Sequence, residues 1–166
     1  LDVLLESLPQ VIQKFSDVRI VLLGDGPEME RLQSMVKEKH LESNVEFRGW
    51  INRNELPQQI SDASIAIGPL KRTTVTENAL PIKVLEYMAS SLPILAISGT
   101  LPEDVLVHGK NGYFIKDSNE LGERICKLLD NPELTESMGY ESLKMVQKFS
   151  WEKIVSDILK SYESIR

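Results

Sequence analysis

The sequence predicts an α/β protein with a Rossmann-like, doubly wound parallel sheet. Five short runs of aliphatic and aromatic residues have the length of buried strands, and each ends near a glycine, a proline or a polar turn. Between these runs, apolar residues recur at the spacing of one helix face. Because no internal repeat divides the chain, we expect a single domain over residues 1–166.

The expected elements alternate along the chain. The predicted strands are apolar runs at residues 18–23, 45–48, 64–67, 93–97 and 112–115. The predicted helices carry an apolar face and cover approximately residues 4–15, 29–36, 56–60, 81–92, 118–129, 132–148 and 151–162. Strands separated by helices of this length favour parallel pairing.

Local signals set the expected ends of several elements. Asn54 is a suitable N-cap for the short helix that follows it, and Ser118 for the helix at 118–129. Gly112 completes a turn before the last strand. The run at 18–23 is apolar almost throughout, so we expect this strand to be buried on both faces.

Composition and charge exclude several classes of protein. The net charge of −6 argues against nucleic acid as the main partner. Cys126 is the only cysteine, which excludes an intrachain disulfide or a thiolate metal cluster and fits a reducing, cytoplasmic compartment. No apolar run reaches the roughly 20 residues that span a membrane. Acidic residues do not occur at the spacing of metal ligands, so no metal site is predicted.

The stretch at 78–89 is the strongest candidate for a binding site. Pro81 suits the first position of a helix. The amides of Ile82 and Lys83 would then lie at the positive end of the helix dipole, which favours an anion such as phosphate. Glu86 lies one turn further on, beside the apolar face, where its carboxylate could accept hydrogen bonds from a sugar diol. The pattern leaves open a second interpretation, in which Glu86 is solvated and paired with Lys83.

A glycine turn marks another part of the expected binding edge. Gly24 and Gly26 stand between a strand and a helix, as in the dinucleotide-binding fingerprint. Position 29 should then hold a third glycine or an alanine, but it holds methionine, which disfavours a nicotinamide cofactor. The turn still lies at a carboxyl end of a strand, where open α/β sheets bind their ligands.

Several motifs follow one another in a specific order over essentially the whole chain. They are LGDGP at 23–27, VEFRG at 45–49, SDAS at 61–64, LEYMA at 85–89, LPI at 92–94, HGKNGY at 108–113 and FSW at 149–151. Together they resemble the C-terminal, nucleotide-sugar-binding domain of the family-four (group 1) retaining glycosyltransferases. That family has the two-domain GT-B fold, so the resemblance implies that this chain is one half of such a fold.

The resemblance implies a set of donor contacts. Glu86 matches the second glutamate of the family's Glu-x7-Glu motif, which holds the ribose hydroxyls of the nucleotide. The helix start at Pro81, Ile82 and Lys83 matches the segment that faces the diphosphate, and Gly24 matches the glycine turn at the same edge. Backbone groups of Trp50 and Ile51 fall where the family holds the base.

The chain departs from the family at the first glutamate of that motif. Its place holds Asn78, with Glu77 one residue earlier. Either residue is therefore a candidate contact to the donor sugar, and the family pattern does not choose between them.

The resemblance also implies parts of a longer protein. In the family, an N-terminal acceptor domain and the first strand of this domain precede the helix at 4–15. That strand occupies the middle of the sheet order 3-2-1-4-5-6. We therefore expect the natural protein to supply a strand before Leu1 that pairs with the strand at 18–23. Direct pairing of the two halves of the sheet would contradict this expectation.

The implied activity is transfer of a sugar from UDP or GDP to a glycan or a lipid-linked acceptor, with retention. The family needs no metal or other cofactor, and this chain without the acceptor domain would be inactive. The natural protein would be cytoplasmic, with a peripheral association at the inner membrane face. Two other functions stay open: a nucleotide-sugar epimerase of GT-B fold, and a domain that binds a nucleotide sugar without transferring it.

Overall fold

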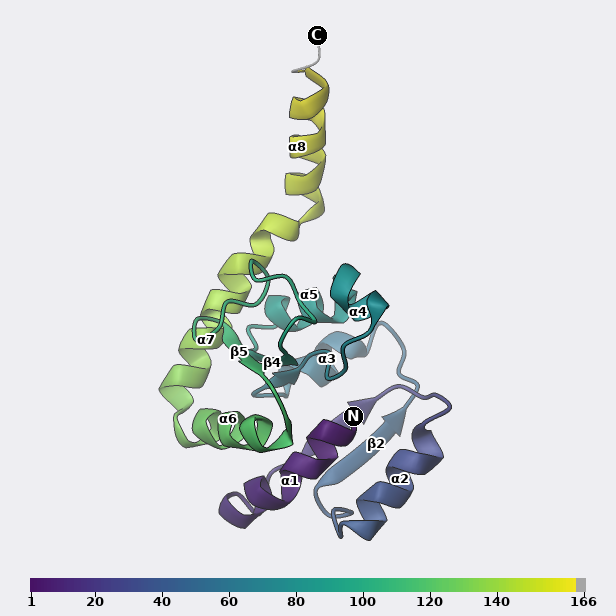
Figure 1. Ribbon diagram of the computed structural model, residues 1–166. Coiled ribbons are helices and arrows are strands. Elements are labelled where there is room, and N and C mark those ends of the chain that lie inside the picture. Colours follow the sequence, from purple (N-terminus) through teal and green to yellow (C-terminus); the bar gives the residue numbers. More distant parts are fainter. Residues whose placement is uncertain (164–166) are drawn as a thin grey trace.

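The computed structural model describes residues 1–163 except the side chain of Asn78. Strands and helices alternate along this part of the chain (Figure 1). The strands are β1 (Ile20–Leu23), β2 (Val45–Gly49), β3 (Ala66–Ile67), β4 (Ile94–Ile97) and β5 (Gly112–Ile115). The helices are α1 (Asp2–Lys14), α2 (Met29–Glu38), α3 (Leu56–Ser61), α4 (Thr74–Asn78), α5 (Ile82–Ala89), α6 (Ser118–Asp130), α7 (Pro132–Val146), the 3-10 helix η1 (Gln147–Phe149) and α8 (Trp151–Glu163). The predicted α/β class is confirmed.

The strands form two parallel sheets. One sheet has the order β1-β2 and the other the order β3-β4-β5. Among the described residues, no ladder joins the two sheets. In this part of the chain, the two halves of the sheet are therefore not paired directly. Direct pairing would have contradicted the predicted strand between them. The strand itself stays a prediction.

Helix packing joins the two sheets where strand pairing does not. Helix α1, beside the β1-β2 sheet, packs along α6 (Figure 1). The Gln10 side chain of α1 donates a hydrogen bond of 2.9 Å from Nε2 to the carbonyl of Asn119. Gly122 permits this close approach, because a Cβ at its position would overlap the Gln10 side chain. The α1–α6 contact therefore fixes how the two halves face each other.

Strand β4 lies between two hydrophobic clusters. Leu95 belongs to the cluster that α1 and α6 supply. Ile94 and Ala96, on the other face of the strand, belong to a second cluster with Val84 and Met88 of α5. All five side chains are fully buried. The alternation along β4 thus anchors α5 against the sheet.

The prediction that the first strand is buried on both faces is wrong. Ile20 and Leu22 pack against the same cluster as Leu95, to which α2 also contributes, but Val21 and Leu23 are 38% and 36% exposed. Neighbouring residues of a strand point to opposite faces, and helices cover only one face of β1. An apolar run is therefore necessary for burial on both faces but does not ensure it.

Two predicted N-caps are displaced by one residue. Helix α3 follows Glu55 rather than Asn54, and Glu55 makes no side-chain capping bond. Helix α6 is capped by Asp117 rather than Ser118, since the Asp117 carboxylate accepts a 2.9 Å hydrogen bond from the amide of Glu120. Both acids and hydroxyls can cap a helix, so a pair of adjacent candidates leaves the choice to the backbone conformation.

Helix α8 extends away from the rest of the molecule (Figure 1). None of its residues is buried. Its predicted apolar stripe is present but largely exposed, as shown by Trp151, Val155, Ile158, Leu159 and Tyr162. Over residues 1–163, no helix is both long enough and apolar enough to cross a membrane.

Candidate functional site

The carboxyl ends of β1 and β2 meet at one edge of the molecule. The amide of Gly24 donates a 2.7 Å hydrogen bond to the carbonyl of Gly49. Both glycines have positive φ, +116° and +60°, which favours glycine at these positions. This pairing places the Gly24 turn next to the loop that starts at Trp50.

Helix α5 forms the facing part of this edge. It begins at Ile82, with Pro81 as its N-cap in an extended conformation (φ −66°, ψ 128°), so the predicted start lies one residue too early. The amides of Ile82 and Lys83 lie in the first turn, where N–H groups have no carbonyl of the same helix to bind. Val84 is fully buried and holds this turn against the core.

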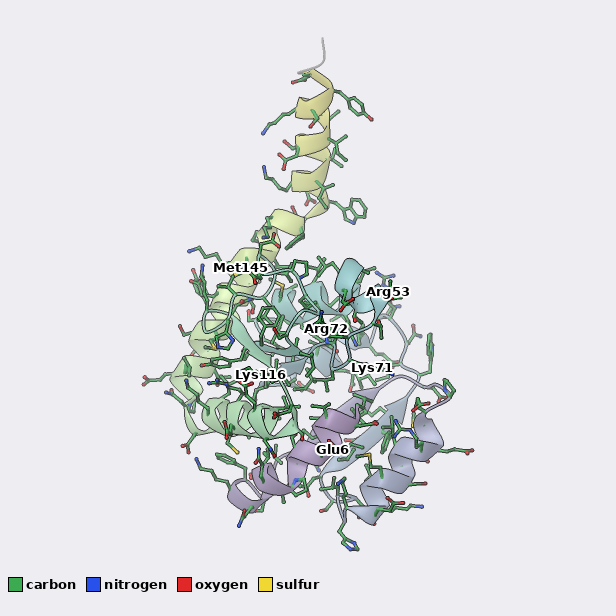
Figure 2. The ribbon with its side chains drawn as sticks, in the orientation of Figure 1. Glu6, Arg53, Lys71, Arg72, Lys116 and Met145 are labelled. Atoms are coloured by element: carbon green, nitrogen blue, oxygen red, sulfur yellow. The ribbon has the colours of Figure 1, made fainter. Side chains whose placement is uncertain are left out.

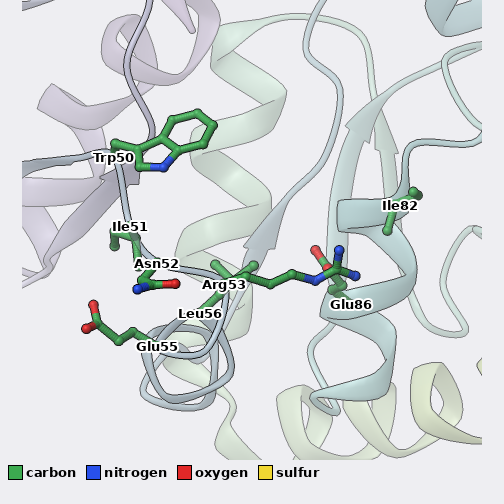
Figure 3. Close-up of a pocket in the computed structure, with 8 residues that line it drawn as sticks. All are labelled: Trp50, Ile51, Asn52, Arg53, Glu55, Leu56, Ile82 and Glu86. Carbon is green, nitrogen blue, oxygen red and sulfur yellow. The ribbon is translucent and has the colours of Figure 1, made fainter.

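A surface pocket of about 820 Å³ lies between the loop after β2 and the first turns of α5 (Figure 3). Its lining residues are Trp50, Ile51, Asn52, Arg53, Glu55, Leu56, Ile82 and Glu86. Four predicted site residues, from two segments about thirty positions apart, therefore meet in one pocket. Pro81, Lys83 and Gly24, the other predicted contacts around it, do not line it.

Residues 52–56 complete the pocket and were not predicted as site residues. The Arg53 side chain extends toward Glu86 on the α5 side of the pocket (Figure 3). A signal for these residues exists in the sequence, because they follow Ile51 directly at the carboxyl end of a strand. Which side chains of that loop face α5 depends on the packing of α3, and this packing cannot be read from the local pattern.

Glu86 is half-buried, and it does not form an ion pair with Lys83 among the described interactions. Lys83 is exposed. Burial, and to a smaller extent the negative charge of Glu86, raises the pKa of the neighbouring Tyr87 hydroxyl. Among the residues that the structure describes, no cationic group lies within ion-pair distance of this carboxylate, and Glu86 lines the pocket. That arrangement suits a ligand that donates hydrogen bonds.

The two candidates for a sugar contact differ in what the structure shows. Glu77, in α4, accepts a 2.9 Å hydrogen bond from Nε of Arg72, and the two residues form an ion pair with 2.8 Å between Nη2 and Oε1. Asn78 is the last residue of α4, and its side chain lies outside the described residues. Among the side chains that the structure describes, no group of three or more His, Cys, Asp or Glu is arranged to hold a metal ion.

The fold is shared with solved glycosyltransferase structures. HepE from Anabaena, in complex with UDP and glucose, matches with a TM-score of 0.83 at 20% identity, over 98% of this chain and 44% of that chain. The C-terminal domain of a group 1 glycosyl transferase from Francisella tularensis matches with a TM-score of 0.72 at 21% identity, over 87% of this chain and 75% of that domain. At these identities the likeness shows the fold alone, one half of the GT-B architecture.

Sequence comparison identifies the family. Curated relatives include a poly(ribitol-phosphate) alpha-N-acetylglucosaminyltransferase of Staphylococcus aureus, 25% identical over 99% of this chain and 33% of its own length. A phosphatidyl-myo-inositol mannosyltransferase of Mycobacterium leprae is 26% identical over 99% of this chain and 43% of its own. The chain thus spans between a third and a half of the length of these relatives. Residues 1–145 match the family described as glycosyl transferases group 1, and the chain belongs to that family.

Proposed function

We propose that this chain is the donor-binding half of a retaining glycosyltransferase that transfers a sugar from UDP or GDP to an acceptor. The observation that carries the proposal is the pocket that brings Trp50 and Ile51 together with Ile82 and Glu86. Family membership supports the same function, and so do the UDP complexes of proteins with this fold.

The nucleoside would lie in this pocket. Glu86 would accept two hydrogen bonds from the vicinal hydroxyls of the ribose, since a carboxylate offers two acceptor oxygens to a diol. The base would lie against the loop at Trp50 and Ile51, where backbone amides and carbonyls can bind its edge. Trp50 is 86% exposed, which leaves its ring accessible to a ligand.

The diphosphate would lie at the start of α5. The amides of Ile82 and Lys83 point out of the first turn, and the helix dipole adds positive potential there. Pro81 fixes the entry of the chain into the helix, and the Gly24 turn lies at the same edge of the sheets. With this positive potential, the leaving diphosphate would be stabilised by the protein and without a metal ion.

The acceptor in this proposal is a glycan or a lipid-linked molecule. Among the relatives, one is named for poly(ribitol-phosphate) and another for phosphatidyl-myo-inositol. The groups that bind the acceptor would belong to a further domain of the natural protein. That protein would act in the cytoplasm, at the inner face of the membrane when its acceptor is a lipid.

Titration calorimetry of the chain with UDP and GDP tests the donor site. We expect Glu86→Gln to weaken binding of the preferred nucleotide by about ten- to hundredfold, because hydrogen bonds to a charged group contribute roughly 1.5–3 kcal/mol. Glu123→Gln, an exposed change on α6, removes the same charge away from the pocket and should leave the affinity unchanged. Equal affinities of wild type and Glu86→Gln would exclude the ribose role.

A further inference from the structure

Arg72 occupies the loop between β3 and α4, at the carboxyl end of β3 (Figure 2). Its Nε donates a 2.9 Å hydrogen bond to Glu77 Oε1, and its Nη2 lies 2.8 Å from the same oxygen in an ion pair. A guanidinium carries five N–H donors, and one carboxylate oxygen does not use them all. The Arg72 side chain is 62% exposed, so the remaining donors are open to a ligand.

The segment that carries Arg72 is held by a network of hydrogen bonds. The amide of Thr76 donates to Thr73 Oγ1 at 3.1 Å, and the amide of Thr73 donates to Thr76 Oγ1 at 2.8 Å. The hydroxyl of Thr76 also donates to the carbonyl of Lys71 at 2.9 Å. This capping box ties the residues on both sides of Arg72 to the first turn of α4. The loop that carries the guanidinium is therefore fixed by these hydrogen bonds.

The other side of Arg72 lies against the backbone after β4. Gly99 has a φ of +79°, and a Cβ at its position would lie 3.2 Å from Cζ and 3.3 Å from Nε of Arg72. Any other residue would crowd the guanidinium or strain the backbone. Arg72 thus spans the carboxyl ends of the neighbouring strands β3 and β4, which is the edge where open parallel sheets bind ligands.

We infer that Arg72 binds the terminal phosphate of the donor diphosphate and that Glu77 positions it for this contact. The inference rests on the proposed function, which places the diphosphate at the start of α5, and α5 begins four residues after the end of α4. A planar guanidinium matches two phosphate oxygens at once, whereas sugar hydroxyls do not require a cation. Glu77 then acts through Arg72 and does not contact the sugar itself.

Binding of UMP and UDP, or of GMP and GDP, separates this contact from those of the nucleoside. We expect Arg72→Gln to weaken binding of the diphosphate by about tenfold or more and to change binding of the monophosphate by less than about twofold. Arg19→Gln makes the same change of net charge. Arg19 is exposed and directly precedes β1, at the end of the strand opposite to the Gly24 turn, so this variant should bind both ligands as wild type does. An unchanged melting temperature verifies the fold of each variant.

Three results distinguish failure of the inference from failure of the proposed function. If wild type binds none of these nucleotides, both fail. If wild type binds and Arg72→Gln binds the diphosphate equally well, the inference alone fails. It also fails if Arg72→Gln weakens both ligands by the same factor, because the contact would then not be to the terminal phosphate.

A double-mutant cycle tests the role assigned to Glu77. If Glu77 acts through Arg72, Glu77→Gln changes the affinity for the diphosphate in the wild type but has no further effect in Arg72→Gln. The same cycle is repeated with the nucleotide sugar. If Glu77→Gln lowers its affinity equally in both backgrounds, Glu77 contacts the sugar directly and the positioning role is excluded.

Discussion

The two sheets of this molecule are built from similar apolar strands but differ in how they are covered. In β4, Ile94, Leu95 and Ala96 are all fully buried, because hydrophobic clusters lie on both faces. In β1, Val21 and Leu23 are more than a third exposed. The difference shows that an apolar run is compatible with either environment, and that neighbouring segments decide which one it has.

The two halves also contribute different parts of the pocket. The β1-β2 half supplies the loop that starts at Trp50, and the β3-β4-β5 half supplies α5 with Glu86. The loop crosses from one half to the other, because Ile60 of α3 already belongs to the cluster that anchors α5. The pocket therefore depends on the packing between the halves as well as on the residues that line it.

Glycine-to-alanine substitutions should give the largest difference between the halves in the cost to the free energy of unfolding. A Cβ at Gly112, which has a φ of +149°, would overlap the carbonyl of Ile94 in the β4-β5 ladder. We expect Gly112→Ala to lower the free energy of unfolding by more than about 4 kcal/mol, as for other severe backbone clashes. Gly26→Ala, in the loop after β1, meets no atom within 4 Å and should cost less than about 0.5 kcal/mol. Urea denaturation measures both, and equal costs would contradict the comparison.

Shortening strand side chains to alanine should give a smaller difference between the halves in the cost to the free energy of unfolding, in the same direction. Leu95→Ala removes a fully buried side chain from the hydrophobic cluster that α1 and α6 supply, and should cost about 3 kcal/mol. Val21→Ala removes a side chain that is 38% exposed, and should cost less than about 1 kcal/mol. The same denaturation measurements apply. A cost at Val21 as large as that at Leu95 would mean that the exposed face of β1 is covered in solution.

The smallest expected effect is on the pH dependence of the free energy of unfolding, through Tyr87 in the half that carries α5. Burial first, and the charge of Glu86 second, raises the pKa of Tyr87 above its ordinary value of 10.0. The unfolded chain ionises near that ordinary value, so the stabilising contribution is complete below about pH 10 and is lost as the pH rises through the raised pKa. Tyr87→Phe should remove this loss when unfolding is followed between about pH 9 and pH 11. A loss of the same size in Tyr87→Phe would assign the effect to other groups.

Much of this architecture could be predicted from local sequence patterns. Each of the predicted strands is present, and the apolar face predicted at helical spacing for residues 81–92 is buried at Val84 and Met88. That spacing leaves Glu86 outside the buried stripe, but the pattern did not decide whether Glu86 pairs with Lys83 or lines a pocket. Ordered motifs over the whole chain indicated the family, because they combine turns and caps at fixed distances.

Other features were decided only by the tertiary structure. The extension of Arg53 toward Glu86 (Figure 3), and the pairing of Glu77 with Arg72 beside Gly99, depend on which loops meet at the edge of the sheets. The exposure of Val21 depends on which face of β1 the helices cover. Local sequence determines periodicity and chain reversal, because these arise from neighbouring residues. Contacts between distant segments arise from the packing of whole helices and sheets, which no local pattern specifies.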